Sequence, residues 1–156
     1  MQSFFLLIWL TLCASQDIRQ RHIANHLTLG ASVVALVFLG WTGRTWLGAE
    51  AVQGGWAFLL ALAFTLPGYA ARRLGAGDVK LMTALALATD GMHVLGTFMG
   101  AGLASVGWLL LAPRVWLHMS QGLRNHLRYL GPGTSNKQPF APFVLLGFLL
   151  SLAWIQ

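Results

Sequence analysis

Acidic residues and cysteine are scarce in this sequence. The chain has 156 residues but one cysteine, Cys13, and four acids, Asp17, Glu50, Asp78 and Asp90. A single cysteine excludes an internal disulfide and any zinc site that needs several cysteines. Charged residues of either sign make up 9% of the chain, whereas soluble domains carry about 25%. The composition therefore excludes an ordinary soluble domain.

Apolar residues take the place of the missing charges. Hydrophobic residues make up 56% of the chain, and the mean hydropathy is +0.65. A helix needs about 20 apolar residues to cross a bilayer, so the chain has room for several spans but not for a soluble domain as well. We expect an all-α, polytopic integral membrane protein with a single membrane-embedded domain over residues 1–156.

Polar connections divide the apolar sequence into about six expected transmembrane helices. Residues 1–18 contain no Lys or Arg, so they lack the basic start of a secretory signal peptide, and we expect them to stay as a helix; a cleaved leader is the alternative. The longest polar section, 113–138, has a pattern that favours a helix lying on the membrane. The expected spans are 2–15, 27–41, 54–71, 79–88, 92–112 and about 139–154.

Basic residues predict the orientation. The formal net charge is +6, and basic loops beside membrane spans usually mark the cytoplasmic side and attract anionic lipid. We therefore expect membrane lipid and not nucleic acid as a partner. If segments 17–26, 72–80 and 113–138 share one side, that side holds every Lys and Arg except Arg44. It is then the cytoplasmic side.

Asp17 and Asp78 are the candidate catalytic residues, because both lie in these cytoplasmic segments at the ends of spans. Two carboxylates a few ångströms apart do not both ionise easily, so one can accept a proton from water while the other donates one to a carbonyl oxygen. Gly75 and Gly77 precede Asp78 and are expected to permit a tight turn and close substrate approach. Taken singly, either aspartate has the alternative of a helix cap, and Asp17 that of an interfacial residue.

Other polar residues have weaker patterns. Lys80 is expected to orient Asp78 or the substrate backbone, or else to extend its amine to the membrane surface. Asn25 is expected to hydrogen-bond across the site or to cap the second helix. No cysteine or further cytoplasmic acid accompanies the histidines, so we expect neither a metal nor another cofactor. These histidines are His22, His26, His118 and His126.

Three segments together resemble the type IV prepilin peptidases, a family of intramembrane aspartyl proteases. Gly75 to Asp78, followed by Lys80, resembles the family's Gly-x-Gly-Asp signature. Asp17, followed by residues 23–25, is similar to its Asp-x-x-x-x-x-Ile-Pro-Asn segment, with alanine in place of the proline. Residues 139–143 are similar to its Pro-Phe-Gly-Pro-Phe motif. The resemblance spans about residues 17–150.

The resemblance implies an aspartic endopeptidase of the bacterial inner membrane, with Asp17 and Asp78 catalytic. The implied substrate is a prepilin or pseudopilin, whose leader peptide is cut at the cytoplasmic membrane boundary. One cysteine leaves no cysteine-pair domain, so the resemblance implies no methyltransferase, and the chain is similar in size to the enzymes that process Flp-type pilins in tight-adherence systems. The alternatives are a small proton- or cation-coupled transporter or channel subunit, which favours an acid within a span, and a non-catalytic pilus-assembly scaffold.

Overall fold

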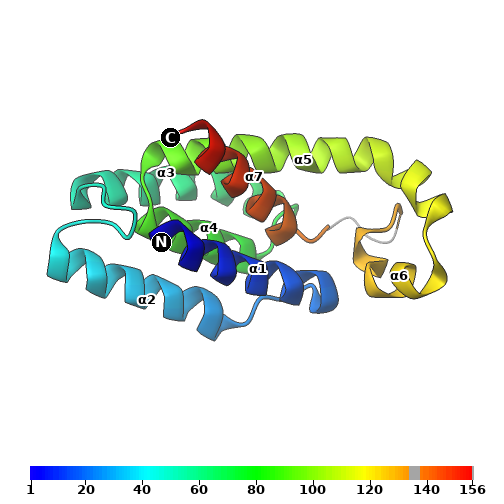
Figure 1. Ribbon diagram of the computed structural model, residues 1–156, viewed down its shortest axis with the longest axis horizontal. Coiled ribbons are helices and arrows are strands. Elements are labelled where there is room, and N and C mark those ends of the chain that lie inside the picture. The colour runs from blue at the N-terminus through cyan, green and yellow to red at the C-terminus, as the bar shows by residue number, and fades with distance from the viewer. Residues whose placement is uncertain (134–137, 156) are drawn as a thin grey trace.

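The computed structural model describes residues 1–133 and 138–155. Within these ranges the secondary structure is helical apart from one isolated β-bridge, between Arg44 and Glu50. Figure 1 shows the helices as a bundle from which one end of the longest helix extends. The helices are α1 (Gln2–Gln20), α2 (Asn25–Thr42), α3 (Ala51–Ala70), α4 (Ala76–Ala88), α5 (Gly91–His118), α6 (Gln121–His126), the short 3₁₀ helix η1 (Arg128–Leu130) and α7 (Ala141–Trp154).

Successive long helices run in alternating directions. The indole Nε1 of Trp46 donates a hydrogen bond to the carbonyl oxygen of Gln2, and Leu47 N donates one to the carbonyl oxygen of Ala88. These bonds bring the start of α1, the loop after α2 and the end of α4 to one end of the bundle. Both chain termini also lie near this end in Figure 1. The opposite end therefore gathers the end of α1, the start of α4 and the start of α7.

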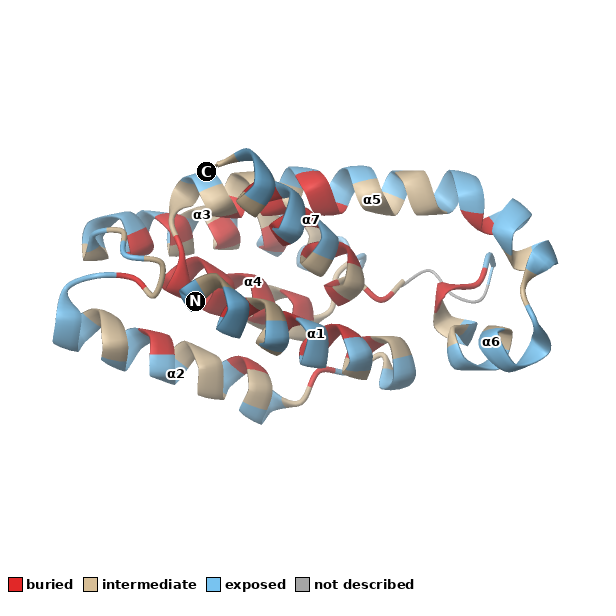
Figure 2. Ribbon diagram, in the orientation of Figure 1, coloured by how far each residue is buried: buried red, intermediate tan, exposed pale blue. Residues whose placement is uncertain are grey.

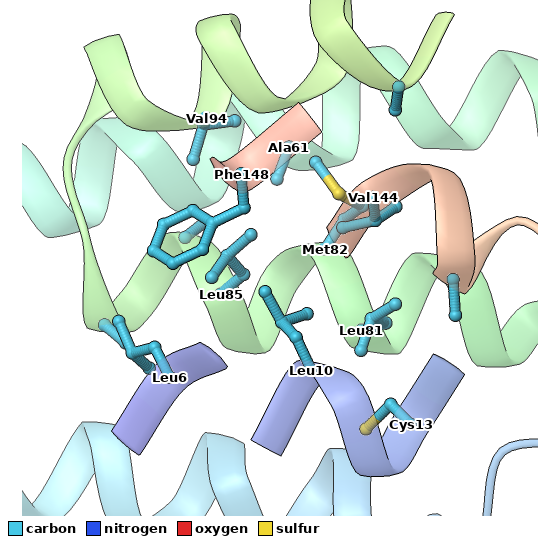
Figure 3. Packing of buried hydrophobic residues seen from close by; sticks show 14 of the residues in the cluster. Leu6, Leu10, Cys13, Ala61, Leu81, Met82, Leu85, Val94, Val144 and Phe148 are labelled. Atoms are coloured by element: carbon cyan, nitrogen blue, oxygen red, sulfur yellow. The ribbon is translucent and has the colours of Figure 1, made fainter. Parts of the chain in front are cut away.

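Helix α4 is the centre of the bundle. Every residue from Leu81 to Ala88 is buried, whereas α2 buries only Thr28 and Ala35. A helix that is apolar all round is stable when neighbours cover it on every side. Figure 2 shows this contrast as a mainly buried α4 beside a mainly exposed α2. Figure 3 shows the α4 residues packed among side chains of α1 and α7, including Leu10 and Phe148.

Helices α5 and α7 pack closely because glycines face each other between them. A Cβ atom added to Gly100 would lie 2.7 Å from the Cα of Gly147, and one added to Gly96 would lie 2.9 Å from the Cβ of a serine on α7. Small residues let membrane helices approach to backbone contact. Gly102 and Gly107 have no such neighbour within 4 Å. Gly96 and Gly100 are thus the small residues that allow α5 to contact α7 closely.

Three helices, α2, α3 and α5, are long and apolar enough to cross a membrane. Helix α7 is apolar but has 14 residues, and α4 has 13. At 1.5 Å per residue, α4 is roughly 20 Å long, against about 30 Å for the hydrocarbon core. The all-α membrane fold is confirmed, and each predicted span corresponds to a helix. Six complete crossings remain a prediction.

The segment after the fifth predicted span differs from our expectation. Helix α5 continues through Pro113 to His118 instead of ending at Ala112. Proline is tolerated inside membrane helices because neighbouring helices, polar side chains and local changes of helix geometry satisfy the backbone groups that it leaves without a partner. Helix α6 has six residues and buries none of them, so the predicted surface helix over 113–138 is wrong in its extent. Lys137, which we assigned to the cytoplasmic side, lies outside the described residues.

Candidate active site

Asp17 lies in the last turn of α1 and is 5% exposed. Its Oδ2 atom accepts a hydrogen bond of 3.0 Å from the backbone N–H of Ala141, the first residue of α7. The first N–H groups of a helix have no acceptor within that helix, and Phe140 at the N-cap of α7 supplies none from its side chain. Asp17 therefore does not cap its own helix but satisfies the start of another.

Asp78 lies in the first turn of α4, which begins at Ala76 and not at Val79 as predicted. Its Oδ2 atom accepts a hydrogen bond of 2.9 Å from the N–H of Gly75, and the residue is 9% exposed. This bond reaches back to the N-cap from the third helical position, as in a capping box. The capping alternative is thus partly correct, although a carboxylate has two oxygens and this bond occupies one of them.

One cavity brings the two aspartates together. It has a volume of about 420 Å³, within the range of about 300–1,000 Å³ typical of ligand sites. Four parts of the chain form its walls: the end of α1, the connection from α3 to α4 with the first turn of α4, the η1 helix, and the segment before α7. The lining residues are Asp17, Gln20, Arg21, Arg73, Gly75, Asp78, Tyr129, Gln138 and Pro139.

The electrostatic surroundings of the two carboxylates are alike. Each accepts a backbone N–H at a helix start, Asp17 from α7 and Asp78 from α4. Helix starts carry a partial positive charge, and Arg21 and Arg73 line the same cavity. Burying a carboxylate without such partners is costly. The site therefore holds two carboxyl groups away from bulk water among groups that stabilise negative charge.

The glycines beside Asp78 do not form the tight turn that we expected. Gly75 has φ −85° and ψ 160°, and the glycines with positive φ in the described ranges do not include Gly75 or Gly77. Gly77 instead packs against Ile23, since a Cβ added to Gly77 would lie 3.7 Å from the Cβ of Ile23. The turn prediction is wrong, and close approach of a substrate to these glycines remains a prediction. Beside Ile23, Gly77 has room for a Cβ atom but not for a larger side chain.

Lys80 and Asn25 join helices and do not line the cavity. Lys80 Nζ donates a hydrogen bond of 3.0 Å to Asn25 Oδ1, which links α4 to the first residue of α2. The capping alternative for Asn25 is wrong, because α2 has Ala24 as its N-cap and no side-chain cap. The N–H of Ala24 donates to Gln16 Oε1 at 2.9 Å, a bond that the family proline could not make.

Sequence reasoning missed Arg21, Arg73 and Tyr129. Arg21 follows Asp17 by one helical turn, and this spacing was a usable signal for it. Arg73 is five positions before Asp78 in the chain, beyond a break in helix, so its spacing gave no such signal. Tyr129 comes from the three-residue η1 helix, and its position depends on the return of a distant segment.

Among the described residues, the charged groups that line the cavity are two carboxylates and two guanidiniums. Guanidiniums beside the carboxylates disfavour a bound cation. Across residues 1–133 and 138–155, no group of three or more His, Cys, Asp or Glu side chains is arranged to hold a metal ion. The expectation of a site without a metal or cofactor remains a prediction.

Comparison with known proteins identifies the family of this chain. The model of the type IV leader peptidase family matches residues 4–111. The chain belongs to this family. Searches of curated proteins and of solved structures found no significant match. The range matched by the leader peptidase model includes both Asp17 and Asp78, whereas Pro139 to Phe143 lies beyond it, so the role of that motif rests on the bond between Ala141 and Asp17.

Proposed function

We propose that this leader peptidase is an aspartic endopeptidase with Asp17 and Asp78 as its catalytic pair. The observation that carries the proposal is the cavity that both side chains line. Membership of the leader peptidase family indicates a peptidase, and the cavity contains the two carboxyl groups that we propose for catalysis. Glu50 and Asp90 are on the loops at the opposite end of the bundle, so the cavity has no other acid to offer.

The proposed reaction is hydrolysis of one peptide bond. The two carboxyl groups share one proton; the ionised one takes a proton from water as the water oxygen adds to the peptide carbonyl, and the other donates its proton to the carbonyl oxygen. The tetrahedral intermediate then breaks at its C–N bond: the leaving nitrogen takes the proton of one carboxyl group, and the other carboxylate takes a proton from a hydroxyl group of the intermediate, so that the pair again holds one proton. Acid and base exchange roles during the cycle, so the roles belong to the pair and not to one residue.

The alternatives fit the bundle less well. A proton- or cation-coupled transporter needs polar groups near the middle of the membrane. Both cavity acids are at helix ends, and the helix that follows Asp78 is buried and almost wholly apolar from Leu81 to Ala88. A pilus-assembly scaffold would need no buried pair of carboxylates. The arrangement therefore favours the peptidase.

The proposed substrate is the leader of a type IV prepilin, of the Flp type in particular, cut at the cytoplasmic face of the bacterial inner membrane. The sidedness rests on the basic residues at the cavity end of the bundle, whereas Arg44 is at the other end. These residues lie in the connections or in the adjoining helix turns: Arg19, Arg21, Arg72, Arg73 and Lys80. Positive loops remain cytoplasmic. The Flp assignment rests on the resemblance alone.

The test is processing of a defined substrate. The purified protein, reconstituted into liposomes, is incubated with an Flp-type prepilin, and the product is followed by gel shift and by sequencing of its new N-terminus. We expect one cut between leader and mature pilin. Failure of folded, correctly inserted protein to cut any prepilin would overturn the proposal.

A further inference from the structure

Two arginines have fixed backbone positions beside the cavity. Arg21 is the C-cap of α1, where its N–H donates to the carbonyl oxygen of Asp17 at 2.8 Å. Arg73 follows α3, where its N–H donates to the carbonyl oxygen of Gly68 at 2.9 Å. Both side chains line the cavity that contains the two aspartates. These bonds fix the backbone from which the two side chains extend into the lining of the cavity.

Tyr129 holds the Arg21 side chain at this wall. The guanidinium of Arg21 lies over the Tyr129 ring at 5.4 Å from its centroid, a distance at which cation–π attraction operates. The next residue, Leu130, is buried, and its carbonyl oxygen accepts a hydrogen bond of 2.9 Å from Trp108 Nε1 on α5. The η1 wall is therefore anchored to the bundle.

The charges of the described lining residues are unbalanced in the state that the proposed reaction requires. When the aspartates share one proton, one negative charge faces the two positive guanidiniums. The excess positive charge disfavours a basic group in the cavity and favours an acidic one. A guanidinium also matches a carboxylate geometrically, since it offers two parallel N–H donors.

We propose that Arg21 and Arg73 form a subsite that binds an acidic side chain of the substrate close to the scissile bond. This inference rests on the proposed function and adds a specificity to it. Both arginines share the cavity with the catalytic pair, so a peptide that reaches the aspartates also comes within reach of the guanidiniums. The subsite selects substrates with a glutamate or aspartate at the matching position.

Other roles for the arginines make different predictions. Arg21 could serve only to offset the charge of Asp17, one turn earlier in α1, and both arginines follow the carboxyl ends of helices, where positive charge is favourable. In those roles, loss of an arginine affects all substrates equally. An anionic lipid headgroup is a further ligand for the same pair, and it would make activity depend on lipid charge and not on the peptide.

The test crosses enzyme variants with substrate variants. Flp-type prepilins carry Glu, Gln or Lys in turn at each position flanking the scissile bond, and kcat/KM is measured for wild type, Arg21→Gln and Arg73→Gln in phosphatidylcholine liposomes. Arg19→Gln and Arg72→Gln are matched controls, because these exposed arginines do not line the cavity. Removing one charge-assisted hydrogen bond should lower kcat/KM by about tenfold or more.

We expect one substrate position at which wild type prefers Glu over Gln by about tenfold. Each cavity variant should lose this preference, because its kcat/KM falls about tenfold further on the Glu substrate than on the Gln substrate, and the controls should keep it. Equal losses on Glu and Gln substrates would overturn the subsite in favour of a positioning role. If wild type shows no preference for Glu and its activity depends instead on added phosphatidylglycerol, the arginines bind lipid and the substrate subsite is overturned. Wild type that cuts none of the substrates contradicts the proposed function itself.

Discussion

The carboxylate of Asp17 accepts a hydrogen bond from the backbone of Ala141, 124 residues later in the chain. This bond ties the first helix to the last and places the Asp17 side chain in the wall of the cavity. The segment before Ala141 contributes Gln138 and Pro139 to the same wall. The start of α7 therefore has a role in positioning the proposed catalytic pair.

Neutralising either aspartate should abolish processing. Asp17→Asn and Asp78→Asn keep an oxygen that can accept the N–H of Ala141 or Gly75, but an amide cannot exchange the proton that the reaction needs. We expect cleavage below detection with normal membrane abundance, measured by prepilin gel shift.

The matched control for this experiment is Asp90→Asn. Asp90 caps α5 through a bond to the N–H of His93 at the opposite end of the bundle, and asparagine caps a helix about as well as aspartate. Its processing should equal that of wild type. Cleavage by a correctly inserted Asp17→Asn or Asp78→Asn protein would remove that residue from the proposed pair.

Prepilin processing should fall as the side chain introduced at Gly77 becomes larger. An added Cβ would lie at an ordinary contact distance of 3.7 Å from the Cβ of Ile23, so Gly77→Ala should process prepilin nearly as well as wild type. Gly77→Val adds two methyl groups at the same contact and should push the start of α4, and Asp78 with it, away from the Ile23 segment. We expect at least a tenfold loss of kcat/KM, because small displacements of catalytic groups are costly.

The control for Gly77 is Gly91→Ala, which has no neighbour within 4 Å of the added Cβ and should be nearly silent. Equal activity of Gly77→Val and Gly77→Ala would show that contact with Ile23 does not position Asp78.

The contact between α5 and α7 gives a prediction about stability. A Cβ on Gly100 would lie 2.7 Å from the Cα of Gly147, so Gly100→Ala must separate the helices and should cost about 1–3 kcal/mol. Gly102→Ala, two residues along the same helix and open on that side, should be neutral or slightly stabilising, since alanine favours helix over glycine. Thermal unfolding of both variants in detergent is the measurement, and equal melting temperatures would contradict the close packing.

The all-α membrane fold followed from the sequence because composition and apolar runs depend on local chemistry. The shared location of Asp17 and Asp78 was also predictable, because acids are rare enough for these two to be recognised, and their catalytic role stays a prediction. The end of α5 was not, since Pro113 normally marks the end of a helix and only the surrounding structure lets it continue. The cavity positions of Arg73 and Tyr129 could not be predicted either, because they depend on how separate helix ends meet.

The orientation of the cavity is the last prediction, and a cytoplasmic cut depends on it. Single cysteines at positions 22, 50 and 126 are introduced into a Cys13→Ala background, since Cys13 is fully buried and alanine adds no polar group there. His22, Glu50 and His126 are all exposed, so each cysteine is accessible from its own side. A membrane-impermeant thiol reagent applied from the periplasm should label position 50 and spare positions 22 and 126, because the basic connections remain cytoplasmic. Labelling at position 22 with intact membranes would place the cavity on the periplasmic side. Labelling at position 126 but not at position 22 would show that α5 does not return the chain to the side of Asp17.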